Sequence, residues 1–133
     1  MNKSLSLLIM IATLGLTYAA GAQAYEGDWK RGRVYFRQVC TNCHLSISGK
    51  AISPAEKMKA EWNDYLVTDK HDVKGKSNHS VKYYVSREFR QSIANENKAA
   101  QKFLDVPNTE LNADIHAFVV YGAKDSDNPS RCQ

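Results

Sequence analysis

The sequence predicts a small all-α domain, and three observations support this prediction. Between residues 25 and 133, apolar side chains recur at steps of three and four, the spacing of one face of an α-helix. Residues that commonly cap helices, Asp28, Ser53 and Ser80, stand just before these stretches. The alternation of apolar and polar residues that marks strands is missing. We therefore expect four to five helices and no sheet.

The N-terminal residues 1–24 have the pattern of a secretory signal peptide. Lys3 supplies a positive start, the stretch 5–20 is mostly apolar or small, and Ala22-Gln23-Ala24 forms an A-x-A cleavage site. The apolar stretch is shorter than the roughly 20 residues that a membrane-spanning helix needs. We expect cleavage after Ala24, which leaves residues 25–133 as one domain. That domain is expected in the periplasm or otherwise exported, soluble and without a stable membrane anchor.

The first predicted helix follows Asp28 and runs from Trp29 toward Cys43. Its apolar face contains Trp29, Gly32, Phe36, Val39, Cys40 and Cys43. The second begins at the capping box Ser53-Pro54-Ala55-Glu56 and should run to about Val67. Its apolar face contains Met58, Trp62 and Leu66. Residues 68–79 are polar and lack periodicity, so they are expected to form a surface loop.

Three further helices are expected after this loop. Ser80 should cap a third helix whose apolar positions are Val81, Val85, Phe89 and Ile93. A short helix over residues 98–104 is ended by Pro107. Asn108 or Thr109 should cap the last helix, whose stripe consists of Leu111, Ile115, Phe118 and Tyr121/Gly122.

The segment Cys40-Thr41-Asn42-Cys43-His44 is a C-x-x-C-H motif, which attaches c-type haem. Two thiols one helical turn apart can bond to the two haem vinyl groups, and the histidine that follows can bind the iron. C-x-x-C also occurs in zinc sites and in thioredoxin-like redox sites. No second ligand pair for zinc follows, and no strand–helix alternation of the thioredoxin kind is present. The motif therefore predicts one covalent haem c, with His44 as proximal ligand.

The mature chain resembles the class I cytochrome c family over most of its length. The residues that carry the resemblance are Gly32, Phe36 and the C-x-x-C-H motif in the first helix, and Asp114-Ile115-His116-Ala117-Phe118-Val119-Val120-Tyr121 in the last. The resemblance implies a small cytochrome c-like fold whose helices pack around one covalently bound haem. It also implies that the two end helices cross, with Tyr121 or Phe118 lying against Gly32.

The second iron ligand is where the sequence departs from that family. The family uses a methionine shortly before the last helix, but residues 101–110 contain none. The remaining candidates are Met58, His71, His79, His116 and Cys132. We favour Cys132, because a cysteine that remains without a partner in an exported chain suggests a functional sulfur. The alternative is that Cys132 is a tail thiol without a structural role. A His/Cys pair would resemble the paired monohaem cytochromes of the Nax type from anammox bacteria.

Electron transfer by Fe(II)/Fe(III) cycling is the expected function, and the chain is not expected to be an enzyme, although a catalytic haem stays open. The alternative is a low-potential haem subunit that binds or senses nitric oxide or carbon monoxide. A formal net charge of +4 is too small to predict nucleic-acid binding. Redox partner proteins could dock on a basic face formed by Lys57, Lys59, Lys70, Lys74, Lys76 and Lys82. The alternative is that these lysines form an ordinary solvated surface. Surplus aromatics favour a homo- or heterodimer with a similar cytochrome: Trp62, Tyr65, Tyr83, Tyr84 and Phe89.

Overall fold

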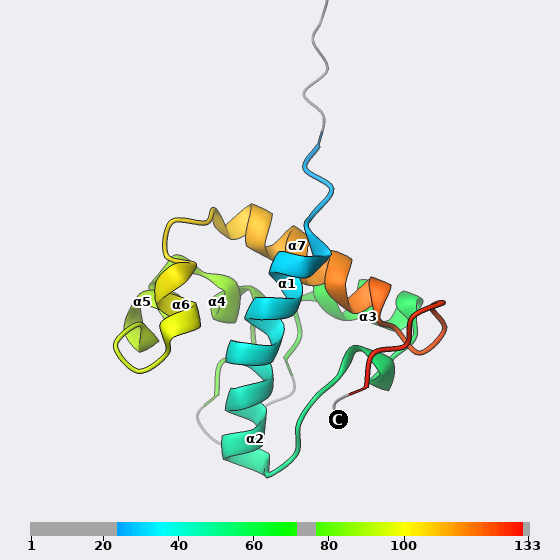
Figure 1. Ribbon diagram of the computed structural model, residues 1–133, viewed down its shortest axis with the longest axis horizontal. Coiled ribbons are helices and arrows are strands. Elements are labelled where there is room, and N and C mark those ends of the chain that lie inside the picture. Colours follow the sequence, from blue (N-terminus) through cyan, green and yellow to red (C-terminus); the bar gives the residue numbers. More distant parts are fainter. Residues whose placement is uncertain (1–23, 72–76, 132–133) are drawn as a thin grey trace, which may run out of the picture.

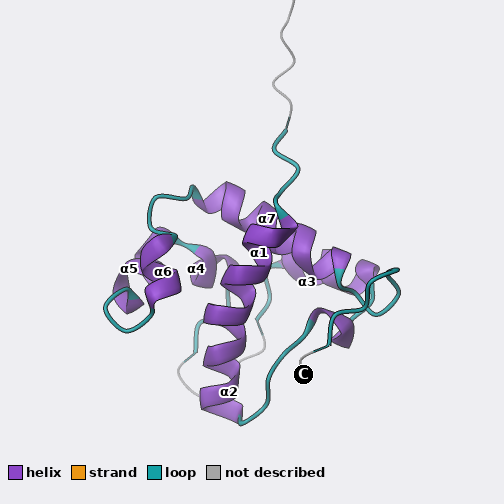
Figure 2. Ribbon diagram, viewed as in Figure 1, coloured by secondary structure: helices purple, strands orange, loops and turns teal. Residues whose placement is uncertain are grey.

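The computed structural model describes residues 24–71 and 77–131, and within these ranges the secondary structure is entirely helical (Figures 1 and 2). The all-α prediction is thereby confirmed. None of the helices in the described ranges has the length and apolarity to cross a membrane. The elements in chain order are α1 (Trp29–Tyr35), η1 (Phe36–Thr41), α2 (Asn42–Ser48), η2 (Pro54–Glu56), α3 (Lys59–Thr68), α4 (Val81–Val85), α5 (Arg87–Ile93), α6 (Lys98–Lys102) and α7 (Asn108–Tyr121).

The first three elements form one continuous helix, the longest in Figure 1. Its start is as predicted, because the Asp28 carboxylate accepts hydrogen bonds from the backbone N–H groups of Lys30 and Arg31 at 2.8 and 3.2 Å. The helix extends beyond the predicted end at Cys43 and stops at Gly49, whose φ of +70° is the left-handed conformation that favours glycine. Its middle section, η1, is a π-helix, a wider turn found often at functional sites.

The most extensive helix contact is the crossing of α1 and α7 (Figure 1). At the crossing point a Cβ on Gly32 would lie 2.0 Å from the carbonyl oxygen of Asp114, so only glycine fits. The expectation that Tyr121 or Phe118 lies against Gly32 was wrong, since the backbone of α7 occupies that place. Tyr121 stacks on Trp29 at 4.2 Å, and Phe118 meets the Phe36 ring edge-on at 5.4 Å.

A buried carboxylate fastens the same crossing. The side chain of Asp114 is fully buried and accepts hydrogen bonds from the Asp28 backbone N–H at 2.7 Å, the Tyr25 hydroxyl at 2.5 Å and the Arg31 guanidinium. Arg31 also pairs with Glu110 at 3.0 Å. Because a buried charge is costly unless it is paired and hydrogen-bonded, these partners make the crossing specific to one arrangement.

The second predicted helix begins later than its sequence indicates. Ser53 precedes only a short 3-10 turn, η2, and its side chain makes no capping hydrogen bond. The capping interaction belongs to α3, where the Glu61 carboxylate accepts the backbone N–H of Met58 at 2.7 Å. Met58 therefore precedes α3 and is 47% exposed, instead of lying on an apolar helix face as predicted. Trp62 and Leu66 are buried as expected.

The helix expected from Ser80 to Ile93 is two helices, α4 and α5. Ser80 caps α4 as predicted, but the extended backbone of Ser86 ends that helix and its side chain caps α5. The break brings Arg90 into the protein, where it is fully buried. Its guanidinium donates to the carbonyl oxygens of Phe103 and Val106, the latter at 2.9 Å. This arginine closes the turn between α6 and α7.

The last helix and the chain after it enclose one side of the core. The stripe Leu111, Ile115 and Phe118 is buried as predicted. The helix already includes Asn108, whose side-chain oxygen accepts from Arg90 at 2.6 Å and does not cap α7. After Gly122 the tail folds back, and its backbone pairs with residues 55 and 57 through Ser130 and Lys124 at 3.1 and 2.9 Å.

Candidate haem site

The three residues of the C-x-x-C-H motif lie at the far end of the long helix from the α1–α7 crossing. Cys40 belongs to the π-helical section, and Cys43 and His44 to α2. All three are partly exposed. The wide turn leaves the Gln38 carbonyl oxygen free to accept the side-chain amides of Asn42 and Asn97 at 3.0 and 2.9 Å. These amides hold the π section, and with it the position of Cys40.

Cys40 differs from an ordinary surface cysteine. It packs against the hydrophobic core, and burial, with a smaller contribution from Cys43, raises the pKa of its thiol to about 12. A thiol reacts through its thiolate, so the folded chain without haem keeps this sulfur in its unreactive form.

Helix α2 itself is covered by little protein. None of its residues, Asn42–Ser48, is buried, and Leu45 and Ile47 are 51% and 65% exposed. Figure 1 shows α2 projecting from the rest of the molecule. In soluble domains most helical stability comes from packing an apolar face, so this section fits a helix that is completed by an apolar group bound beside it.

A second histidine lies beside the motif. The ring centroids of His44 and His71 are 5.6 Å apart, with an angle of 71° between the ring planes. His71 comes from the stretch after α3 and is partly buried. Its ring also contacts that of Tyr84 on α4, at 5.0 Å. Of the sequence-predicted ligands in the described ranges, His44 and His71 are brought together.

The ends of the loop that contains His71 are tied to each other. The His71 backbone N–H donates to the His79 carbonyl oxygen at 2.7 Å. Asp69, in the left-handed conformation at the end of α3, accepts the Ser80 hydroxyl at 2.6 Å and the Lys82 backbone N–H at 2.8 Å. Burial alone raises the pKa of Asp69, but these hydrogen bonds outweigh it and hold the pKa below its usual value.

This function of Asp69 was not predicted from the sequence. The available signal was an aspartate placed directly after the predicted helix, since Asp tolerates a left-handed backbone and accepts turn hydrogen bonds.

The other proposed ligands are placed for other contacts, although the His79 backbone carbonyl accepts the His71 N–H. His79 is exposed, and the His116 ring, on α7, is hydrogen-bonded to the Asn63 side chain on α3 at 2.5 Å. Met58 is exposed ahead of α3. Cys132, the ligand favoured from the sequence, lies outside the described residues.

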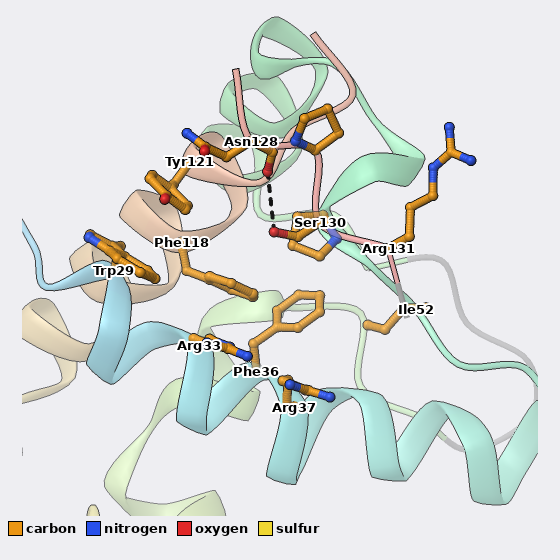
Figure 3. Close-up of a pocket in the computed structure, with 12 residues that line it drawn as sticks. Trp29, Arg33, Phe36, Arg37, Ile52, Phe118, Tyr121, Asn128, Ser130 and Arg131 are labelled. Atoms are coloured by element: carbon orange, nitrogen blue, oxygen red, sulfur yellow. Dashed lines mark hydrogen bonds between the residues drawn. The ribbon is translucent and has the colours of Figure 1, made fainter. Parts of the chain in front are cut away.

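A groove of about 540 Å³ opens between the long helix and the tail. Figure 3 shows the rings of Phe36 and Phe118 pointing into it. Arg33 and Arg37 line one wall from the helix, and the chain from Asn128 to Arg131 lines the other. Cys40, Cys43 and His44 do not line this groove, so it is distinct from the motif.

The aromatic residues expected at a subunit interface pack against one another within the chain. Tyr83, Tyr84 and Phe89 form a cluster with centroid distances of 5.0 to 5.5 Å, adjacent to His71. The Trp62 and Tyr65 rings meet edge-on at 5.8 Å. Trp62 is buried, and the other four aromatics are partly buried.

Among the described residues, only some of the lysines expected to form a basic docking face are exposed. The Lys57 ammonium lies over the rings of Trp62 and Tyr65, at 6.0 and 5.7 Å. Lys70 and Lys82 are exposed, and Lys74 and Lys76 lie outside the described residues.

Comparison with known proteins finds no matching family model, no matching curated protein and no matching solved structure. Among the described side chains, no group of three or more His, Cys, Asp or Glu is placed to hold a metal ion. The donor set of the motif is of a different kind: two thiols for carbon and one imidazole for iron.

Proposed function

We propose that the chain is an exported monohaem c-type cytochrome that carries single electrons. Cys40 and Cys43 would hold the haem as thioethers, and His44 would bind its iron. The observation that carries the proposal is the placement of two thiols and an imidazole at the one end of the long helix where α2 buries no residue. An apolar macrocycle bound there would cover that end.

The fold proposed for this function is of the class I cytochrome c type. Its support is the crossing of the first and last helices, with Gly32 against the backbone of Asp114 and the Trp29–Tyr121 stack beside it. Such a crossing leaves the C-x-x-C-H end of the first helix directed away from α7.

Attachment of the haem requires only addition. The S–H of each cysteine would add across one vinyl group, so that sulfur bonds to one carbon, hydrogen to the other, and nothing leaves. Because the partly buried Cys40 packs against the core and the pKa of its thiol is raised to about 12, attachment is expected to precede folding.

When bound, the haem supplies an iron that alternates between Fe(II) and Fe(III). The chain's own residues then set the conditions of that exchange. His44 would bind the metal, and exposed Lys70 and Lys82 would offer positive charge to an acidic redox partner.

The alternative, binding of nitric oxide or carbon monoxide, requires an open or weakly held sixth position on the iron. His71 beside His44 favours the carrier, because a second imidazole is available to fill that position. Addition of carbon monoxide to the reduced protein separates the two functions: a carrier with a filled site keeps its spectrum.

The test is production of the chain in cells with a working cytochrome c maturation system. We expect a coloured protein whose mass exceeds that of the polypeptide by one haem, which is reduced by dithionite and reoxidised reversibly by ferricyanide. The variant Cys40→Ser/Cys43→Ser should lose the covalent haem.

Cys132→Ser is the matched control, because it removes a cysteine outside the motif and should retain the full haem mass. A colourless wild-type protein without added mass would refute the proposal. So would a double variant that keeps covalent haem.

A further inference from the structure

We propose that His71 is the second axial ligand of the iron, opposite His44. This inference rests on the proposed haem attachment and replaces Cys132 as the favoured sixth ligand. It makes the site a bis-histidine centre, whereas the resembled families use methionine or cysteine in this position.

The separation of the two rings is the first argument. An imidazole nitrogen binds a transition-metal ion at about 2 Å, so two rings on opposite sides of one iron have centroids about 6 Å apart. The His44 and His71 centroids are 5.6 Å apart. The separation of the two rings is therefore close to the one that a shared iron requires.

The rigidity of the His71 backbone is the second argument. His71 is held at the base of its loop by the backbone hydrogen bond to His79, and the Asp69 carboxylate ties the same base to the start of α4. The Tyr84 ring lies against the imidazole at 5.0 Å, while the Tyr84 hydroxyl accepts the Asn78 backbone N–H at 2.7 Å. A ligand positioned in this way loses little conformational entropy on binding.

The described competitors are placed for other interactions. The His116 ring on α7 is hydrogen-bonded to the Asn63 side chain on α3, and Met58 is exposed directly before α3. His79 is exposed, although its backbone pairs with that of His71. That pairing makes His79 a matched control for His71.

A bis-histidine iron has definite properties. It is six-coordinate and low-spin in both oxidation states, and its potential lies below that of a His/Met centre, because the thioether of methionine raises the potential. A filled sixth position also slows the binding of carbon monoxide. The crossed ring planes, 71° apart, predict a strongly anisotropic low-spin ferric EPR signal.

The experiment compares holoprotein of the wild type with His71→Ala and His79→Ala. We expect His71→Ala to convert the ferric spectrum to high-spin, to bind carbon monoxide when reduced, and to return to low-spin on addition of free imidazole. His79→Ala should keep the wild-type spectrum and stay closed to carbon monoxide.

A second pair of variants keeps the test decisive if His71→Ala accumulates poorly. In His71→Met we expect a higher potential and the near-infrared charge-transfer band of a sulfur–iron bond, whereas Cys132→Ala should leave every band unchanged. Wild-type spectra in His71→Met, or loss of the low-spin spectrum in Cys132→Ala, would overturn the assignment. Both results require covalent haem to be present, so they differ from failure of the proposed function, in which no haem is attached.

Discussion

The two ends of the long helix differ in how they are stabilised. At the α1 end, Gly32 lets two backbones touch, Asp114 is fully buried with three hydrogen-bond donors, and the aromatic rings of Trp29 and Tyr121 stack. At the α2 end no residue is buried. The comparison teaches that the polypeptide packs the α1 end of this helix against α7 and leaves the residues of α2 unburied.

The largest effect is expected from Gly32→Val. A Cβ at this position would lie 2.0 Å from the Asp114 carbonyl oxygen, so the helices must separate. We expect a loss of more than about 3 kcal/mol in the free energy of unfolding, or failure to fold. Denaturant unfolding of the holoprotein measures this loss of unfolding free energy.

Gly49→Ala is the control at the other end of the helix. No atom lies within 4 Å of a Cβ there, and the cost is only that of a left-handed φ, about 1 kcal/mol. Equal losses for the two variants would contradict the proposed difference between the ends.

Removal of leucine side chains should distinguish the two ends almost as strongly. Leu111 on α7 is fully buried, so Leu111→Ala should cost about 3 kcal/mol of unfolding free energy. Leu45 on α2 is 51% exposed, and Leu45→Ala should cost less than about 0.5 kcal/mol. Thermal unfolding monitored by circular dichroism compares them, and a large loss in Leu45→Ala would show that α2 is packed by protein.

Asp114→Asn tests the buried carboxylate. Its substitution weakens the hydrogen bond from the Arg31 guanidinium and leaves that charge with Glu110 alone, so we expect a loss of about 2 kcal/mol. Arg87→Ala is the control, because Arg87 and Asp105 form an exposed pair at 3.8 Å that should contribute less than about 0.5 kcal/mol. If both variants unfold at the same denaturant concentration, the Asp114 carboxylate does not stabilise the α1–α7 crossing.

The smallest effect concerns alkaline pH. Burial raises the pKa of Tyr35 well above its usual value, so this phenol ionises more readily in the unfolded chain. The unfolded state then holds fewer protons than the native state, and stability falls by up to about 1.4 kcal/mol for each pH unit above about 10. Tyr35→Phe should have a shallower decline between pH 10 and 11, measured by urea unfolding, and an identical slope would argue against this contribution.

The parts of the fold that were predictable are those set by local sequence. Asp28 and Ser80 cap helices, and the stripe on α7 is buried, because these patterns depend on residues within a few positions of one another. One continuous helix was predicted over residues 80–93 because apolar residues recur every four positions on both sides of Ser86, where the backbone breaks the helix. The π-helical section of η1 has no comparable local signal.

The candidate site was predictable in part for the same reason. Cys40, Cys43 and His44 form a contiguous motif, whereas the approach of His71 depends on a loop closed by Asp69 and by one backbone hydrogen bond. Residues 68–79 have no periodic pattern that predicts how the ends of this loop are joined. Arg90 was likewise missed, since its burial depends on carbonyl groups more than ten positions away.

The π-helical section has a consequence for how the two ends are oriented. A π-turn adds a residue to an α-helix, and one residue corresponds to about 100° of rotation about the helix axis. The section Phe36–Thr41 lies between the glycine at the crossing and the second cysteine of the motif. It therefore sets the angular phase between the side of the helix that packs on α7 and the side that presents sulfur. Deletion of one residue within Phe36–Thr41 would keep the side that packs on α7 and the side that contains the cysteines, but would change the angle between them.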